Sequence, residues 1–356
     1  ERLTALVDKI LTEQTSEDEE ILVLTSSNLA KKNGQIEETQ MSENADKESE
    51  ENTTKDYIKW VDFTVSKFAL TESYEYDRDT YGTDRHISWI DLLAWTAAHT
   101  GGKFGDDRTV CKCMEELEME AEAGKKLEEL TEDLEYFPYY REVYETVLGG
   151  MVGEYEIEEP DAQGRKVTQK RYGLKAFHPI AKGFPYTDYD DFGASRSYGY
   201  RREHLGHDMM GQVGTPVVCV ESGYVEALGW NQYGGWRIGI RSFDKKRYYY
   251  YAHLRQGFPY QPELKEGAVV LAGDVIGYMG HTGYSTKEDV NNIDQTHLHF
   301  GMQLIFDESQ KEGNNEIWID CYQLVQFLPL NRSETKKNPE TKEYSRVLEM
   351  RDPAIP

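Results

Sequence analysis

Two short segments, far apart along the chain, carry side chains that bind metal ions. Residues 296–299 read Thr-His-Leu-His, and residues 204–208 read His-Leu-Gly-His-Asp. Neutral imidazole and carboxylate are ligands that zinc takes, and three protein ligands leave one coordination position for a reactive water. Each segment alone is a weak signal, since a His-x-His pair is more often part of an ordinary strand. Together they predict a hydrolytic metal site.

The spacing of His297 and His299 is typical of a β-strand that serves such a site. Side chains two residues apart in a strand share a face, so both imidazoles would point into the same space. The alternate positions from Leu298 to Leu304 are apolar, as expected for a strand whose other face lies in a core. His253 follows a run of tyrosines at what we expect to be another strand end, where taken alone it could equally be a core or a surface histidine.

A longer series of motifs connects these segments. In chain order they are His204-x-x-x-Asp208, Gly214-Thr215-Pro216-Val217, Gly223-Tyr224-Val225, Tyr251-Ala252-His253-Leu254, Gly267, Gly273, Ile276-Gly277, Gly280-x-Thr282-Gly283 and His297-Leu298-His299-Phe300. This series resembles the LytM/lysostaphin family of zinc metalloendopeptidases over about residues 175–306. Residues 192–196, shortly before the first motif, are similar to the family's entry to its first ligand.

The resemblance implies a role for each matching residue. His204, Asp208 and His299 would hold Zn²⁺, while His253 and His297 would stand beside it as catalytic histidines. Zinc lowers the pKa of its bound water to about 7. A neutral imidazole could then accept the proton as the water attacks a peptide carbonyl, and a second donor could stabilise the oxyanion. The implied function is a zinc-dependent endopeptidase that cleaves peptide cross-links or stem peptides of bacterial peptidoglycan.

Other residues near these motifs receive different interpretations. Tyr198 is expected to offer a hydroxyl to the substrate, whereas His207 is expected to point away from the metal and His281 to lie at the rim of the cleft. The loop 284–296 is longer than the family's usual connection. Because such a loop would border the substrate groove, it leaves the substrate preference open.

Composition limits the class of protein. The formal net charge is -25 over 356 residues, which argues against nucleic acid as a partner because phosphates would be repelled. The four cysteines have no framework spacing, so disulfides are not required. The sequence contains no stretch of about 20 apolar residues, so it predicts no membrane span. The chain starts with Glu1 and not Met, so we expect a processed product from which a signal peptide or membrane anchor is absent.

The pattern along the chain predicts an α+β multidomain protein. We expect an acidic disordered tether over 1–55, a helical domain of unknown role over 56–150, an antiparallel β-rich LytM-type peptidase domain over 151–330 and a polar C-terminal tail over 331–356. Helices are predicted near 56–77, 108–123, 126–135 and 138–149, with a further helix capped by Ser88 and stopped by Gly101. Residues 154–175 are expected to form a hairpin.

Three classes of function remain open at this point. The first is the extracellular peptidase acting on peptidoglycan peptides, attached to the membrane only through an anchor absent from this chain. The second is a silent or autoinhibited scaffold of a cell-envelope machine, whose helical domain could bind an envelope protein or cover the zinc. The third is a sugar- or peptide-binding module, which the run Tyr248 to Tyr251 and Trp230 would serve.

Overall fold

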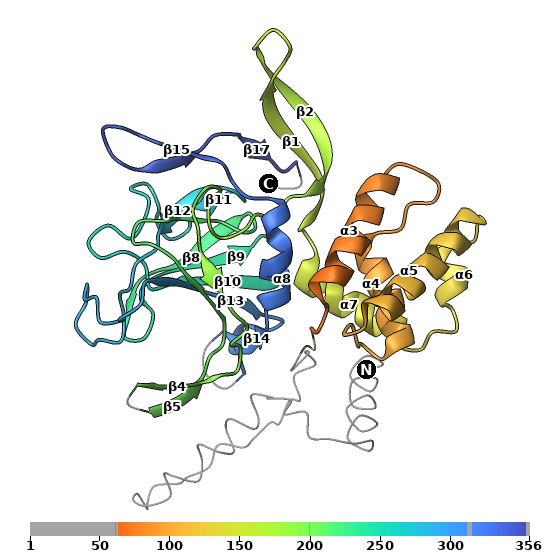
Figure 1. Cartoon of the computed structure of the whole chain (residues 1–356), viewed down its shortest axis with the longest axis horizontal. Helices are drawn as coiled ribbons and strands as arrows, with labels where there is room; N and C mark the ends of the chain where they lie inside the picture. The colour runs from red at the N-terminus through yellow and green to blue at the C-terminus, as the bar shows by residue number, and fades with distance from the viewer. Residues whose placement is uncertain (1–60, 62, 199, 312–314, 354–356) are drawn as a thin grey trace, which may run out of the picture.

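The computed structural model describes residues 61, 63–198, 200–311 and 315–353, so the predicted tether over 1–55 lies outside the described part. The helices are α3 (Lys67–Thr80), α4 (Trp89–Thr100), α5 (Asp107–Glu122), α6 (Leu127–Thr131), α7 (Phe137–Leu148) and α8 (Tyr322–Phe327), with 3-10 turns η1 (Glu308–Gln310) and η2 (Leu328–Leu330). Figure 1 shows α3 to α7 gathered on one side of the molecule and the larger sheet on the other.

The helical region follows the predicted pattern with one correction. Ser88 caps α4 by accepting a hydrogen bond from the Asp91 amide, and Gly101 ends the helix in the left-handed conformation at φ 63°. The predicted helix from residue 56 was wrong over 61 and 63–66, which are not helical. Ser66 instead caps α3, because its side chain accepts from the Ala69 amide and its own backbone is extended.

The β-rich region is built from antiparallel pairs. Its strands are β3 (Thr187–Asp188), β4 (Ser195–Tyr198), β5 (Tyr200–Glu203), β6 (His207–Met210), β7 (Pro216–Val218), β8 (Gly223–Asn231), β9 (Gly235–Ser242), β10 (Arg247–Ala252), β11 (Val269–Val270), β12 (Val275–Tyr278), β13 (His297–Leu304) and β14 (Ile317–Ile319). The main sheet has the order β11-β8-β9-β10-β13-β6-β3, with β14 also paired to β13. Its antiparallel character confirms the predicted sheet type.

Alternation along the central strands separates a core face from an open face. In β13 the side chains of Leu298, Phe300 and Met302 are fully buried, as their phase predicts. In β10 the side chains of Tyr249 and Tyr251 are fully buried, and the tyrosines between them take the opposite phase. The opposite face of these strands is therefore the one that carries the candidate site.

The hairpin lies beside α3, and the C-terminal segment lies along the hairpin and the β-rich region. The predicted hairpin is present as β1 (Val152–Pro160) and β2 (Lys166–Leu174), joined through the turn at Asp161. The segment after residue 330 forms β15 (Thr335–Lys337), β16 (Tyr344–Arg346) and β17 (Met350–Arg351), and β17 pairs with β1. Of the described residues, no helix combines the length and apolar character that a bilayer span requires.

A buried arginine links the helices to the sheet. The Arg247 guanidinium donates two hydrogen bonds to the Glu221 carboxylate, at 2.8 and 2.9 Å, and a third to the Thr146 carbonyl in α7, at 2.7 Å. The Tyr249 hydroxyl also donates to Glu221, at 2.6 Å. Burial opposes the charge of Arg247, but the Glu221 carboxylate holds the pKa of the guanidinium above its usual value. The guanidinium therefore stays charged at any ordinary pH.

Replacing Arg247 is expected to lower stability strongly. Arg247→Met leaves Glu221 buried without its cation, so the free energy of unfolding should fall by about 3 kcal/mol, as measured by urea denaturation. Arg165→Met is the matched control, since Arg165 pairs with Asp161 while its side chain is 75% exposed; the loss there should stay below about 1 kcal/mol. If the two substitutions lowered the free energy of unfolding equally, the buried Arg247–Glu221 pair would not be a major source of stability.

Candidate metal centre

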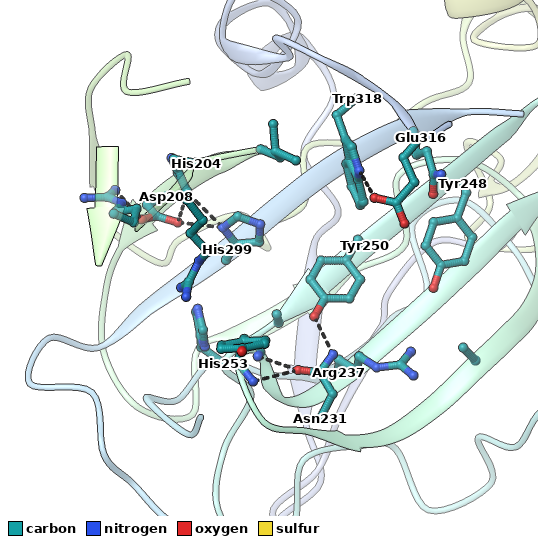
Figure 2. A pocket seen from close by; sticks show the side chains of 18 of the residues that line it. His204, Asp208, Asn231, Arg237, Tyr248, Tyr250, His253, His299, Glu316 and Trp318 are labelled. Atoms are coloured by element: carbon teal, nitrogen blue, oxygen red, sulfur yellow. Dashed lines mark hydrogen bonds and ion pairs between the residues drawn. The ribbon is translucent and has the colours of Figure 1, made fainter. Parts of the chain in front are cut away.

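The pairing of β6 with β13 brings the two predicted metal-binding segments together. In this antiparallel register His299 lies directly opposite Asp208, and residues directly opposite each other point to the same face. His204 lies in the turn that precedes β6 and supplies a third side chain. Figure 2 shows these three side chains at one end of a pocket that continues along the sheet.

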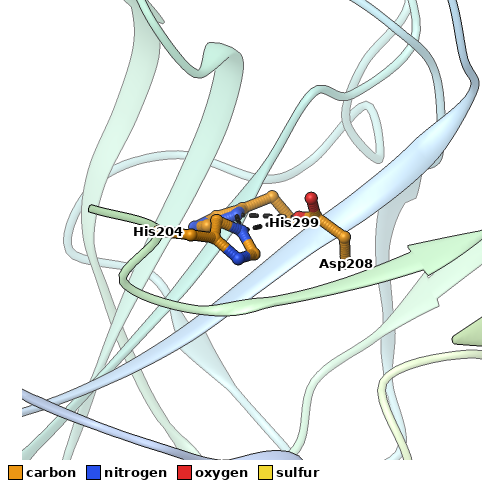
Figure 3. A group of neighbouring side chains, drawn as sticks. All are labelled: His204, Asp208 and His299. Atoms are coloured by element: carbon orange, nitrogen blue, oxygen red, sulfur yellow. Dashed lines mark hydrogen bonds and ion pairs between the residues drawn. The ribbon is translucent and has the colours of Figure 1, made fainter. Parts of the chain in front are cut away.

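The three side chains converge closely enough for one ion. His204 Nε2 lies 2.9 Å from His299 Nδ1 and 3.0 Å from Asp208 Oδ1, and the last two atoms are 3.0 Å apart (Figure 3). Ligand bonds of about 2.1 Å in a tetrahedral arrangement would separate ligand atoms by roughly 3.3 Å. The donor set and its spacing therefore suit Zn²⁺ after only small shifts.

Two further residues, Asp191 and Arg196, hold these side chains in place, and neither was predicted individually. Asp191 presents its carbonyl oxygen at 3.2 Å and its carboxylate at 3.1 Å to His204 Nδ1. Both are acceptors, so Nδ1 of neutral His204 carries the proton and Nε2 offers its lone pair to the cluster. Arg196 donates to the second oxygen of Asp208, at 3.0 Å, and to Asp191. Asp208 is thus left with one oxygen for a metal.

Close packing explains the glycine between the ligands. A Cβ atom at Gly206 would lie 2.6 Å from the ring of His299, much closer than real contacts allow. Gly206 therefore lets the first segment approach the second. The signal was present in the sequence, because this glycine separates His204 from Asp208, but only the fold reveals what it touches.

His253 and His297 stand beside the three ligands, each with one ring nitrogen already engaged. His253 Nδ1 is 2.9 Å from the Thr282 carbonyl, and His297 Nδ1 is 2.8 Å from the Gln295 carbonyl. A carbonyl only accepts, so each Nδ1 carries the proton and each Nε2 is unprotonated in the neutral ring. His297 Nε2 lies 3.8 Å from Asp208, and the rings of the two histidines are 4.6 Å apart.

The electrostatics of the cluster favour an ionised Asp208 and neutral rings at His253 and His299. Burial alone would lower the pKa of His204, but the carboxylates of Asp208 and Asp191 raise it above its usual value. Burial disfavours ionisation of Asp208, but the adjacent side chains of His204 and His299 hold the pKa of its carboxyl well below the usual range. Burial, together with the neighbouring histidines, holds the pKa of His253 well below its usual value. His253 also adopts φ 60°, an uncommon conformation for a non-glycine residue and one often found at functional sites.

The other residues and the loop named in the sequence analysis lie at different places around the cluster. The side chain of Tyr198 lies outside the described part of the chain, so its role stays a prediction. His207 points away from the cluster, as expected, and bonds to Asp188 at 2.9 Å. His281 bonds to the Ile293 carbonyl at 2.7 Å. The long loop 284–296 contributes Tyr284 to the pocket wall.

The pocket is large enough for a peptide and is built entirely from the β-rich region. Its volume is about 680 Å³, within the range of about 300–1,000 Å³ that is typical of ligand sites. Its floor includes the two open-face tyrosines of β10, Tyr248 and Tyr250. No residue of the described helices α3 to α7 lines it. In the part of the chain that the structure describes, the helices therefore do not cover the cluster.

Comparison with known proteins agrees with this centre. The sequence profile of Peptidase family M23 matches residues 202–313, a range that includes His204, Asp208, His253, His297 and His299. The chain is 42% identical over 124 residues to an L-Ala–D-Glu endopeptidase of Bacillus subtilis (strain 168), covering 35% of this chain and 36% of that protein. It is 38% identical over 98 residues to lysostaphin of Staphylococcus simulans, covering 27% of this chain and 17% of that protein.

A solved structure is similar over a longer range. A crystal structure from Ruminococcus gnavus, provisionally named a glycyl-glycine endopeptidase LytM, is 24% identical with a TM-score of 0.45; the match covers 75% of this chain and 97% of that one. The curated relatives named above are matched over about a third of their length or less. With its matched residues 202–313, the chain belongs to peptidase family M23, in the LytM/lysostaphin group.

Proposed function

We propose that this protein is a zinc-dependent endopeptidase that cleaves peptides of bacterial peptidoglycan outside the cytoplasmic membrane. The observation that carries the proposal is the convergence of His204, Asp208 and His299 at one end of an open pocket. The relatives named as L-Ala–D-Glu endopeptidase and lysostaphin support the substrate class.

The chain's own residues suit hydrolysis of a peptide bond. A bound zinc ion would supply Lewis-acid activation of water and of the substrate carbonyl. His253 and His297 each keep an unprotonated Nε2 beside the cluster, so one can accept the proton of the attacking water and pass it to the leaving amine. The other, once protonated, can donate to the oxyanion. Arg196 and Asp191 keep Asp208 and His204 oriented throughout.

A silent or autoinhibited scaffold is a weaker alternative. Such a protein needs an incomplete ligand set or a covered centre. Here the ligand set is complete, and the described helices do not line the pocket. The hypothesis of a pure binding module gives no role to the cluster of His204, Asp208 and His299.

Loss of a ligand should remove both the metal and the activity. His299→Ala is expected to reduce bound zinc from about one ion per chain to near zero and to abolish cleavage of cell-wall peptides, because two protein ligands hold zinc poorly. Zinc would be measured by elemental analysis and products by mass spectrometry, with a chelator as a parallel treatment. His281→Ala is the matched control, since this nearby imidazole lies outside the cluster. Full zinc and full activity in His299→Ala would contradict the proposal.

The two flanking histidines should behave differently from the ligands. His253→Ala and His297→Ala are each expected to keep about one zinc per chain but to lower kcat by about 100-fold or more, since general-base and oxyanion contributions have this size. Zinc content and steady-state kinetics on the same preparation separate the two kinds of residue. Loss of zinc in both variants would assign these histidines to metal binding instead.

A further inference from the structure

Beyond the metal cluster, the pocket contains an arginine that has no acidic partner. Arg237 lies on β9, and Figure 2 shows it past Tyr250 as seen from the cluster. Among the described residues, no carboxylate forms an ion pair or hydrogen bond with its side chain, and its Nε atom is buried without any hydrogen-bond partner. Burying a guanidinium nitrogen without an acceptor costs free energy.

Other arginines of the same sheet show how different this environment is. Arg241, four residues along β9 and on the same face, approaches Glu226 at 3.4 Å and Glu308 at 3.3 Å. Arg247 bonds bidentately to Glu221. In the main sheet the guanidinium groups of Arg241 and Arg247 are each matched by a carboxylate, whereas that of Arg237 is not.

Four acidic residues line the pocket. Three of them are engaged elsewhere, and among the described residues the fourth, Glu203, forms no ion pair with Arg237. Glu226 pairs with Lys311 and Arg241, and Glu316 accepts a hydrogen bond from the Trp318 indole at 2.8 Å. Asp208 belongs to the metal cluster. These carboxylates leave Arg237 free to receive an acceptor from a ligand.

Strand register places Arg237 in one row with the metal ligands. Tyr251 pairs with Ile238, and continuing this register by one residue puts Arg237 opposite Ala252. Ala252 lies opposite His299, which in turn lies opposite Asp208. Two strand spacings of roughly 4.8 Å separate the backbone of Arg237 from that of His299 by roughly 10 Å, the length of about three extended residues.

The space between Arg237 and His299 in this row is open enough for a peptide. The methyl group of Ala252 is the only side chain between Arg237 and His299 in the row, and both flanking side chains line the same pocket. At Gly239, the next open-face position of β9, a Cβ atom would lie 1.9 Å from the Tyr248 hydroxyl, so the absence of a side chain lets this ring lie across the floor. A flat aromatic floor next to a charged end suits an extended peptide.

We propose that Arg237 binds a carboxylate of the substrate peptide, within about three residues of the cleaved bond, and so makes the enzyme selective for acidic peptides. This proposal rests on the proposed endopeptidase function. A guanidinium offers two parallel donors that match a carboxylate, whereas an amide at the same place would accept only one of them. The selected group is a side-chain or terminal carboxylate, because the peptide backbone itself carries none.

The test compares acidic peptides with their amides. The cell-wall peptide cleaved fastest is resynthesised with each carboxylate in turn converted to an amide, and kcat/KM is measured for wild type and Arg237→Gln. In wild type, one of these conversions should lower kcat/KM about tenfold or more. In Arg237→Gln the same conversion should change it by less than about twofold, with zinc content and melting temperature unchanged. Arg237→Lys, which keeps the charge but not the two parallel donors, should fall between them.

Lys311→Gln is the matched control. It removes a positive charge from the same pocket, but Lys311 is already paired with Glu226 and Glu308, so the full preference for the acid should remain. The proposal is overturned if wild type cleaves acid and amide equally, or if Arg237→Gln keeps the wild-type preference. If no peptide is cleaved at all, the endopeptidase function fails, and the ratio of dissociation constants for acid and amide still decides the role of Arg237.

Discussion

The antiparallel pairing of β6 with β13 is the constraint on which the centre depends. It sets Asp208 opposite His299, and the turn before β6 then delivers His204 to the same point. A slip of one residue would move every side chain of one strand to the other face. The fully buried Leu298 and Phe300 prevent that slip, because it would expose them to the pocket. The apolar core on one face therefore fixes the positions of the candidate metal ligands on the other.

Much of the fold follows from local patterns, and the exceptions are long-range. Ser88 and the alternation in β10 and β13 were visible in the sequence, since capping and periodicity act over a few residues. The pairing of β17 with β1 and the Arg247–Glu221 bond join positions far apart in the chain. Nothing in their local sequence marks either contact, so only the fold could reveal them.

The same distinction applies to the centre. Residue type and order pointed to His204, Asp208 and His299 as a group, and the structure brings them together. Asp191, which orients His204, was not marked by the sequence. Arg196, which holds Asp208, was marked only as part of the segment 192–196 and without a role of its own. Orientation by hydrogen bonds depends on angles and distances that a sequence does not contain, yet it decides which nitrogen of His204 is available to a metal.

The local charge inside the pocket differs in sign from the net charge of the whole chain at the position of Arg237. The whole chain carries a net charge of -25, which at long range would repel an acidic peptide. At physiological ionic strength such interactions are screened beyond about 8 Å, so the guanidinium of Arg237 governs only a ligand already in the pocket. Its effect should therefore appear in how long an acidic peptide stays and how it is aligned with the cluster, more than in how fast it arrives. In a strongly acidic protein, such a cation would select ligands through close contact and not through long-range attraction.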